Sequence, residues 1–360
     1  CGDRNPTRAH GFLGERSNLV VQQVNARNLR GVVKAAKGCQ LLINTCPAVM
    51  NKVIMRAALW LRAHYVDTAS HLRENPFRPE QLNFDRRFKT KRRLALIHAG
   101  AAPGLTNLLA VQAAAGLDQT EKAEVRIFEE TASEDPVSQW SAESSFDEAT
   151  SRPRVYRAGR FRYGPRFGEK ELFRFPAPIG RVVVVLAAQD EVVTLPRFLH
   201  FEAMDAKIGG PDMERLRRWY RQGKLSRSRG LSAARFPATP TPRTMTKLLR
   251  RGILRNARFA LAVLMYGRKQ GRPLLIRWDA MFPSLVDLRR RKILCSPIAW
   301  GTAHLTAIFV KQLPLQLAGV YLPEALPLAT RRKILRAAQS SGIRLTKKIL
   351  PLKRRFESGT

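Results

Sequence analysis

Apolar and polar positions follow two alternating periods along the first third of the chain. A short apolar run, QLLIN (40–44), is followed by a helical pattern in VIMRAALWLRA (53–63). Strand patterns follow in HYVDTAS (64–70) and LALIHAG (94–100), and a further helical pattern in LTNLLAVQAAAG (105–116). Alternation with a period of two indicates strands, and a period near 3.6 indicates helices. This order predicts an α/β fold with a parallel sheet and crossover helices.

The ends of the predicted strands indicate where a ligand would bind. In a parallel sheet, ligands lie beyond the carboxyl ends of the strands, where the connecting loops meet. Four such loops start at Asp3, Asn44, Asp67 and Gly100. We therefore expect these four loop ends to face one crevice.

The pattern changes after Asp118 to strand-like segments separated by Pro and Gly. Examples are AEVRIFEE (123–130), RVYRAGRFR (154–162) and RVVVVLAAQDEVVTL (181–195), which predict a mostly antiparallel or mixed sheet. Residues 221–246 are poor in large apolar side chains and rich in Arg, Ser and Pro, so we expect a mobile loop there. Near the end, AWGTAHLTAIFVKQL and TRRKILRAAQSSG have helical periodicity.

Positive charge is concentrated in the second half of the chain. From Lys207 onward there are 34 Lys and Arg against 6 Asp and Glu. Such a surface attracts anions, nucleic acid included. The run RLRRWYRQGKLSRSRG (215–230) could contact phosphates and stack on bases, although a charge run is usually a solvated face. We expect no membrane partner, because no uncharged apolar run approaches about eighteen residues.

Cysteine and histidine do not form a recognisable metal motif. The four cysteines, Cys1, Cys39, Cys46 and Cys295, are scattered, and the six histidines lack ligand spacing. The sequence therefore predicts neither a metal site nor disulfides. Free thiols are typical of a reducing compartment, so we expect a cytoplasmic protein.

Several stretches, in this order, resemble the saccharopine dehydrogenase-like NAD(P)-dependent oxidoreductases, the group of saccharopine reductase and carboxynorspermidine dehydrogenase. They are DRNPTRA (3–9), LLINTCPAVMNKVIMRAALWLRAHYVDTAS (41–70), AGAAPGLTNLLA (99–110), FPAPIG (175–180) before EVVTLPRFL (191–199), and GVYLPEALP (319–327). The resemblance implies a Rossmann-type dinucleotide-binding domain in residues 1–106, onto which 325–360 pack back. It implies a second α/β domain in 107–324, with the substrate contacts and a homodimer surface.

In that family a strand and a glycine-rich turn precede the Asp-Arg-Asn motif. Here the motif begins at Asp3, and no G-x-G-x-x-G occurs in the sequence. That turn normally holds the pyrophosphate on backbone N–H groups. The comparison therefore implies an incomplete, doubly wound Rossmann sheet, truncated at its N-terminus, that lacks its first strand and glycine loop.

The resemblance also implies NAD or NADP as cofactor and assigns residues to it. Asp3 would accept hydrogen bonds from the adenosine ribose and Arg4 would pair with a 2′-phosphate; the alternative for Asp3 is a solvated turn or helix cap. In the family, the loop after the next strand borders the nicotinamide ribose, and the resemblance assigns this role to Asn44, Thr45, Cys46 and Pro47. A loop cap explains Asn44 equally well. Cys46 is expected to have no nucleophilic role.

The next two loops would border the nicotinamide and the substrate. Asp67 and Thr68 follow a strand, and the Asp67 carboxylate could transfer a proton near an imine nitrogen; a helix N-cap is the alternative. Ala102 replaces the Asp of the family's Gly-x-Asp-Pro-Gly turn, which argues against acid–base chemistry in that loop. Substrate contacts are expected from Gly104, Asn107 and Trp140. For Trp140 the alternative is a buried aromatic side chain of the core.

Together these features predict hydride transfer between a nicotinamide and a secondary amine or imine carbon of an amino-acid-derived substrate. Such a reaction needs positioning, water exclusion and a proton carrier rather than a triad or a metal. Without the glycine loop the chain as given could be inactive. A different carbonyl or enoyl reduction is the rival reaction. The rival class is a non-catalytic, basic anion- or nucleic-acid-binding protein on a degraded Rossmann scaffold.

Overall fold

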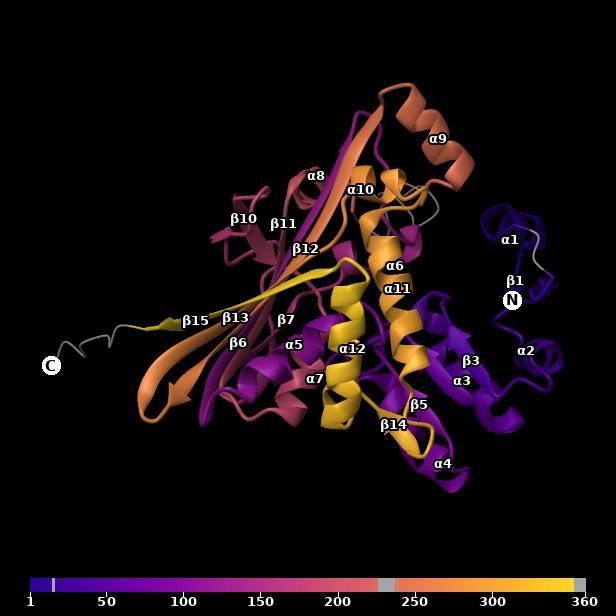
Figure 1. Cartoon of the computed structure of the whole chain (residues 1–360), viewed down its shortest axis with the longest axis horizontal. Helices are drawn as coiled ribbons and strands as arrows, with labels where there is room; N and C mark the ends of the chain where they lie inside the picture. Colours follow the sequence, from indigo (N-terminus) through magenta and orange to yellow (C-terminus); the bar gives the residue numbers. More distant parts are fainter. Residues whose placement is uncertain (15–16, 226–236, 238, 353–360) are drawn as a thin grey trace, which may run out of the picture.

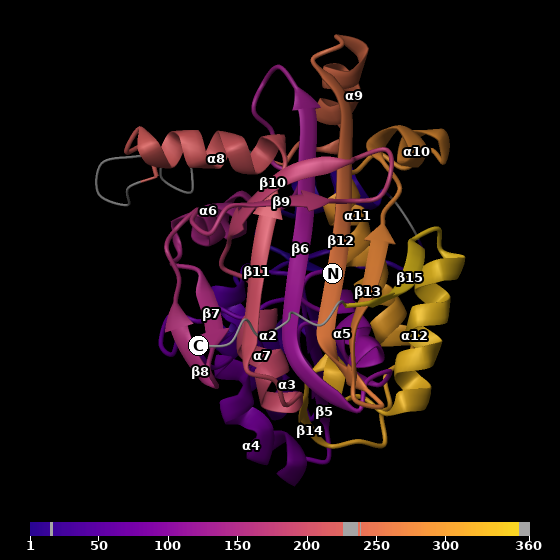
Figure 2. The same ribbon diagram turned by 90° about the vertical axis from the view of Figure 1, so that its left-hand side faces the viewer.

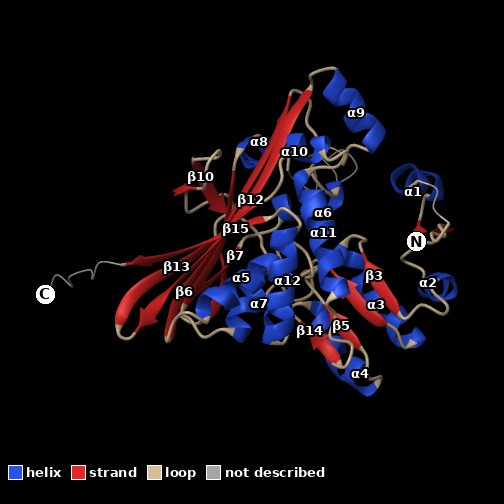
Figure 3. Cartoon of the chain, viewed as in Figure 1, coloured by secondary structure: helices blue, strands red, loops and turns tan. Residues whose placement is uncertain are grey.

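The computed structural model describes residues 1–14, 17–225, 237 and 239–352. Two β-sheets lie on either side of a layer of helices (Figures 1 and 3). The larger sheet is built mainly from the middle of the chain, and the smaller sheet lies towards the N-terminus.

The smaller sheet is parallel and contains four strands in the order β14, β5, β4, β3. Strand β3 (Leu41–Asn44) pairs with β4 (His64–Asp67), and β4 pairs with β5 (Leu94–Leu96). Strand β14 (Gly319–Tyr321) returns from the end of the chain to pair with β5. Each of the first three strands coincides with an apolar run in the sequence. The predicted α/β fold with a parallel sheet is confirmed.

Helices connect these strands and bury one face each. Helix α3 places Met55 and Ala58 in the core against β3 and β4, because positions three and four residues apart share a helix face. The remaining connections are shorter. The bounds are α2 (Leu29–Ala35), η1 (Ala48–Met50), α3 (Asn51–Leu61), η2 (Glu80–Phe84) and α4 (Asp85–Thr90).

The N-terminal residues form a separate small unit. Strand β1 (Gly2–Asp3) pairs in parallel with β2 (Gln22–Gln23), and α1 (Pro6–Leu13) connects them. The side chain of Asn5 caps α1 by accepting a hydrogen bond from the backbone N–H of Arg8 at 3.0 Å. Within the described residues, this pair is not hydrogen-bonded to β3 of the four-stranded sheet.

The larger sheet has nine strands and is mixed, as the sequence predicts. Strand β6 pairs in parallel with β11 and antiparallel with β12. Figure 2 shows the long central strands side by side. The bounds are β6 (Gln119–Ser133), β7 (Arg154–Arg157), β8 (Arg160–Tyr163), β9 (Glu171–Arg174), β10 (Arg181–Leu186), β11 (Ala203–Gly209), β12 (Leu254–Lys269), β13 (Arg272–Met281) and β15 (Arg344–Pro351).

The main hydrophobic core lies between the large sheet and the helices that cover it. Helix α5 is buried on almost every side because it lies between the two sheets, which explains its nearly unbroken apolar sequence. The helices are α5 (Leu105–Ala114), α6 (Ala142–Thr150), α7 (Glu191–Phe198), α8 (Pro211–Arg221), α9 (Pro242–Arg250), α10 (Leu285–Arg290), α11 (Pro297–Lys311), η4 (Pro323–Ala325) and α12 (Leu328–Ser340). No helix in the described ranges has the length and apolarity needed to cross a membrane.

Two expectations about the chain's path differ from the structure. Strand β15 pairs with β13 of the large sheet, so 344–351 do not return to the first sheet as expected for 325–360. The return is made earlier, by β14. Within the predicted loop 221–246, α9 is helical from Pro242, where Thr241 supplies a cap. Residues 226–236 and 238 of that loop lie outside the described residues.

Candidate functional site

A cleft of about 1590 Å³ opens at the carboxyl ends of the parallel strands. Asp3, Asn44, Thr68 and Gly100 line it, one from each of the four loops predicted to converge. Its opposite wall is formed by residues of the large-sheet unit. The prediction of one shared crevice therefore holds for all four loops, although at the third loop Thr68 rather than Asp67 reaches it.

The structure brings most of the predicted site residues together. Three of them lie elsewhere, namely Asp67, Gly104 and Asn107, which do not line the cleft. Those that line it are Asp3, Arg4, Asn44, Thr45, Cys46, Pro47, Thr68 and Trp140.

The Asp3 end of the cleft is rich in positive charge. The Asp3 carboxylate accepts a hydrogen bond from the backbone N–H of Asn5 at 2.7 Å, so it also forms the turn that the alternative interpretation proposed. The exposed side chains of Arg4, Arg8 and Lys37 line the same region. Several cations around one concave surface favour phosphate groups.

Asn44 holds the second loop in shape. Its Oδ1 accepts from the backbone N–H of Cys46 at 3.0 Å, and its Nδ2 donates to Asn51 Oδ1 at 2.8 Å and to Tyr65 Oη at 2.9 Å. The loop-cap alternative thus has direct geometric support. Local burial, followed by the negative charge of Asp3, raises the pKa of the Cys46 thiol. A protonated thiol is a poor nucleophile, which agrees with giving Cys46 no nucleophilic role.

Asp67 is held inside the fold. Its carboxylate accepts hydrogen bonds from Tyr65 Oη at 2.9 Å, Gln81 Nε2 at 3.1 Å and the backbone N–H of His98 at 3.0 Å. Burial raises its pKa to about 7, and these three donors oppose the rise. The carboxyl can hold a proton near neutral pH, yet it lies outside the cleft. A direct role in proton transfer stays a prediction without geometric support.

Gly104 and Asn107 build the base of the fourth loop. Asn107 Oδ1 accepts from the backbone N–H of Gly104 at 2.9 Å, and its Nδ2 donates to Glu324 Oε2 at 3.0 Å and Thr194 Oγ1 at 3.1 Å. Both of its polar atoms are therefore occupied within the fold. The adjoining residues 100–103 line the cleft instead. The predicted substrate contacts of Gly104 and Asn107 are not supported by this placement.

Asp190 joins the two sides of the cleft. Its Oδ2 accepts from the backbone N–H of Ser70 at 2.8 Å and lies 3.6 Å from His98 Nε2. Ser70 Oγ contacts that same Nε2 at 2.5 Å, while His98 Nδ1 has no partner among the described residues. A nucleophilic triad would place the carboxylate on the other ring nitrogen, so this contact joins the two walls rather than activating Ser70.

Sequence reasoning missed the polar residues of the opposite wall. Arg154 is buried, 3.7 Å from Asp190 through its Nη2, and its Nε has no partner within the described structure. Glu129 and Glu148, which were also missed, line this wall beside Trp140, the expected substrate contact. The sequence did contain one signal for this wall. Asp190 and Glu191 directly follow the apolar run RVVVVLAAQ, so they mark a strand end where polar side chains can reach a cleft. Trp219, which could stack on bases under the rival nucleic-acid interpretation, lines a pocket beside the cleft.

The site has the properties that a dinucleotide needs. Its volume exceeds the roughly 300–1,000 Å³ of typical small-ligand pockets, leaving room for a substrate as well. Cationic side chains lie at the Asp3 end, and the small neutral loops 44–47 and 100–103 allow close approach of a ring. Nucleotide cofactors bind at such strand-end clefts in open α/β sheets, so the fold and the site fit a dinucleotide-binding protein.

One family model and several solved structures are similar to this chain. Residues 1–96 match the family model of the saccharopine dehydrogenase NADP binding domain. The fold resembles apo saccharopine dehydrogenase (L-Glu forming) from Saccharomyces cerevisiae, with a TM-score of 0.70 at 11% identity, covering 97% of this chain and 93% of that one. C. glutamicum DAP dehydrogenase matches with a TM-score of 0.41 at 13% identity, covering 88% of this chain and 84% of that one. None of the curated protein sequences matches this chain.

The resemblance to saccharopine dehydrogenase-like NAD(P)-dependent oxidoreductases is therefore confirmed. At 11% identity the structural likeness establishes the fold, and the family match supports NAD or NADP as the cofactor. The family match agrees with an NAD(P)-dependent oxidoreductase.

Proposed function

We propose that this cleft carries out hydride transfer at the secondary amine or imine carbon of an amino-acid-derived substrate. The observation that supports it most is the continuity of the cleft. One cavity joins the strand-end loops with the buried Arg154 and the carboxylates of the opposite wall. A cofactor on one wall and a small polar substrate on the other would share that space.

The nicotinamide supplies the hydride, and the chain's own residues bind and orient the reactants. Arg4, Arg8 and Lys37 attract the cofactor phosphates, and the 44–47 loop borders the ring. Arg154 binds a substrate carboxylate, because its guanidinium is buried with an unpartnered Nε and only a 3.7 Å contact to Asp190. In this proposal Asp67 positions the Thr68–Ser70 loop through its hydrogen bonds.

Cofactor binding is the first test. Titration of NADH and NADPH, followed by nicotinamide fluorescence, should give saturable binding to the purified chain. Absorbance at 340 nm should then report oxidation of the bound cofactor when 2-oxoglutarate or pyruvate is supplied with lysine or another primary amine. Absence of saturable cofactor binding up to millimolar concentration would overturn the proposal.

The role of Arg154 separates substrate binding from cofactor binding. Arg154→Met should raise KM for the carbonyl acid roughly tenfold to a hundredfold, the usual worth of a hydrogen bond to a charged group, and leave NADPH affinity unchanged. Arg160→Met, at an exposed position on β8, is the matched control and should change neither. An unchanged KM in Arg154→Met would remove Arg154 from the site.

The rival anion-binding function predicts a different result. If the basic surface is the functional feature, the chain should shift a labelled oligonucleotide at about 150 mM salt, where non-specific binding is weak, and should not bind NAD(P)H.

We also propose a homodimer, on the family resemblance alone. Light scattering during gel filtration would give a monomer mass of 40.6 kDa if that assignment is wrong.

A further inference from the structure

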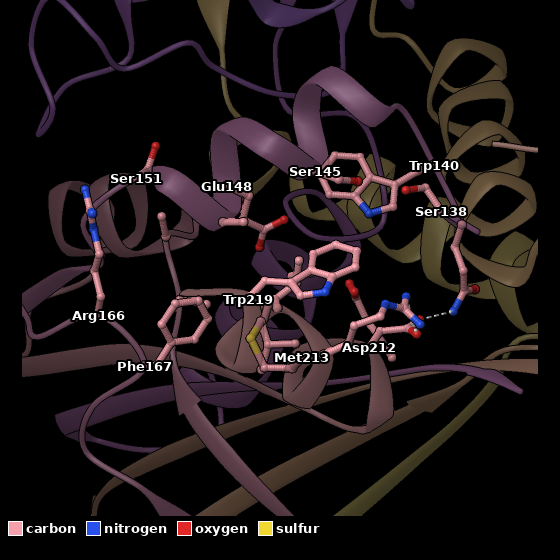
Figure 4. A pocket seen from close by; sticks show the side chains of 18 of the residues that line it. Ser138, Trp140, Ser145, Glu148, Ser151, Arg166, Phe167, Asp212, Met213 and Trp219 are labelled. Carbon is pink, nitrogen blue, oxygen red and sulfur yellow. Dashed lines mark hydrogen bonds and ion pairs between the residues drawn. The ribbon is translucent and has the colours of Figure 1, made fainter. Parts of the chain in front are cut away.

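A second, smaller pocket extends from the cleft into the large-sheet unit (Figure 4). Glu129, Trp140, Glu148 and Ser151 line both cavities, so the pocket opens from the substrate side of the cleft. Its walls are α6, α8 and the end of β6. Its volume of about 50 Å³ corresponds to a few water-sized groups, which suits the end of a substrate rather than a ring.

Three carboxyl side chains, Glu129, Glu148 and Asp212, belong to the polar lining of this pocket. Glu129 and Glu148 form no ion pair within the described part of the chain, although Glu148 accepts a hydrogen bond from Gln189 Nε2. Burial raises the pKa of Glu129 to about 8, and the nearby charge of Asp212 adds to the rise. Burial also raises the pKa of Glu148 well above its usual range, and the charge of Glu129 contributes. These carboxyls lack a cation that would stabilise their charged forms.

The cations that line the pocket are already engaged or lie at its rim. Arg215 Nη2 forms a 2.9 Å ion pair with Asp212 Oδ1. Arg166 is exposed, and its guanidinium carbon lies 5.9 Å from the centre of the Tyr220 ring. No cation pairs with Glu129 or Glu148 within the described part of the chain, so a cation bound in the pocket would favour their ionised forms.

Aromatic faces and an unused acceptor complete the lining. Figure 4 shows the Glu148 carboxyl group directed towards the space beside the indole rings of Trp140 and Trp219. Indole faces attract cations through their quadrupole, and the guanidinium carbon of Arg215 already lies 5.9 Å from the centre of the Trp219 ring, which leaves Trp140 as the indole without such a partner among the described contacts. Gln139 is only 4% exposed and lines the pocket. Its Oε1 has no partner among the described residues, whereas its Nε2 donates to the Glu130 carbonyl at 2.9 Å.

We propose that this pocket binds an organic ammonium group, the amine-bearing end of the substrate. Carboxylates, an amide oxygen and indole faces are all acceptors for N⁺–H donors, and they favour an ammonium end over a carboxylate or phosphate end. The buried Arg154 in the cleft would receive the acidic end of the same molecule. The role as a substrate subsite rests on the function proposed above, whereas the binding of an ammonium group by the pocket does not.

Direct binding tests this proposal without cofactor or turnover. Isothermal calorimetry with n-pentylammonium should show saturable binding to the full chain, and n-pentanoate of equal chain length should not bind. Glu148→Gln should weaken n-pentylammonium binding roughly tenfold to a hundredfold, as expected for loss of a charge-assisted hydrogen bond. Glu129→Gln is a second, independent variant with the same expected direction. Glu202→Gln, at an exposed position, makes the same charge change and should leave binding unchanged.

The amide variants preserve side-chain shape, and far-UV circular dichroism checks that each one folds. The proposal is overturned if the wild-type chain does not bind n-pentylammonium, if n-pentanoate binds equally well, or if both folded Glu→Gln variants bind like the wild type. Loss of NAD(P)H binding in a separate titration would contradict the proposed reaction but not the ammonium site. The two failures are therefore distinguishable.

Discussion

Two buried glutamates beneath the fourth cleft loop give the fold a specific dependence on pH. Glu191 and Glu324 are both fully buried, with one oxygen each lacking a partner among the described residues. Glu191 Oε1 accepts from Thr106 Oγ1 at 2.6 Å, and Glu324 Oε2 accepts from Asn107 Nδ2 at 3.0 Å. Burial raises the pKa of each to about 7, more than these hydrogen bonds lower it.

The sign follows from proton linkage. Both groups release their protons at a higher pH in the folded chain than in the unfolded chain, where the ordinary value is 4.5. Their contribution to stability is therefore fully present below pH 4.5 and is lost as the pH rises towards 7. Between pH 5.5 and 8.5, each carboxyl should lower the free energy of unfolding by about 2 kcal/mol.

Glu324→Gln removes one of these titrations and keeps an oxygen that can accept from Asn107. We expect the difference in unfolding free energy between pH 5.5 and 8.5 to become about 2 kcal/mol smaller than in the wild type. Urea unfolding at both pH values, followed by circular dichroism, measures it. Glu202→Gln, on the surface, should keep the wild-type difference. An unchanged pH dependence in Glu324→Gln would show that Glu324 is not protonated in the folded chain at neutral pH.

Three further predictions concern the loop, the sheet and the cofactor. Gly104→Ala should destabilise the chain by at least about 2 kcal/mol in denaturant unfolding. Gly104 has a φ of +132°, and the new Cβ would lie 2.1 Å from the Gly100 carbonyl oxygen. Gly11→Ala is the control and should not be destabilised, because there is open space around Gly11. Arg126→Met should cost about 1.5–3 kcal/mol by the same measurement, because the buried Glu124 and Asp205 lose their shared cation and keep only Lys122 and Arg157 among the described residues; an exposed Arg160→Met variant that lost as much would contradict this. Arg4→Ala should weaken NADPH binding roughly tenfold more than NADH binding in fluorescence titrations, since a guanidinium favours the 2′-phosphate; equal losses would contradict the assignment.

Much of the fold was predictable from local pattern. The apolar runs at 41–44, 64–67 and 94–96 became β3, β4 and β5, and the apolar helix at 105–114 became α5. Periodicity fixes these elements because each must bury one face or, for α5, nearly all of its surface. The convergence of the loops followed from the parallel order of the strands.

The placement of single side chains was not predictable in the same way. Asp67 and Thr68 are neighbours in the sequence, yet Asp67 is turned into hydrogen bonds from Tyr65, Gln81 and His98 while Thr68 lines the cleft. Successive side chains at a strand end point to opposite sides, and the donors that hold Asp67 come from other elements. Similarly, Asn107 became a structural residue because Glu324, 217 positions away, accepts its amide proton.

The sequence by itself determined which segments form strands and helices, the parallel order of the first sheet and the loops that border the cleft. Tertiary structure alone decided which polar groups face the cleft, and it created the smaller pocket from α6, α8 and β6. Periodicity records burial along one element, because the chain's own geometry sets it. A binding site depends on distances between elements far apart in sequence, such as Glu129 and Glu148 beside Trp219, and those distances are fixed only when the elements pack together.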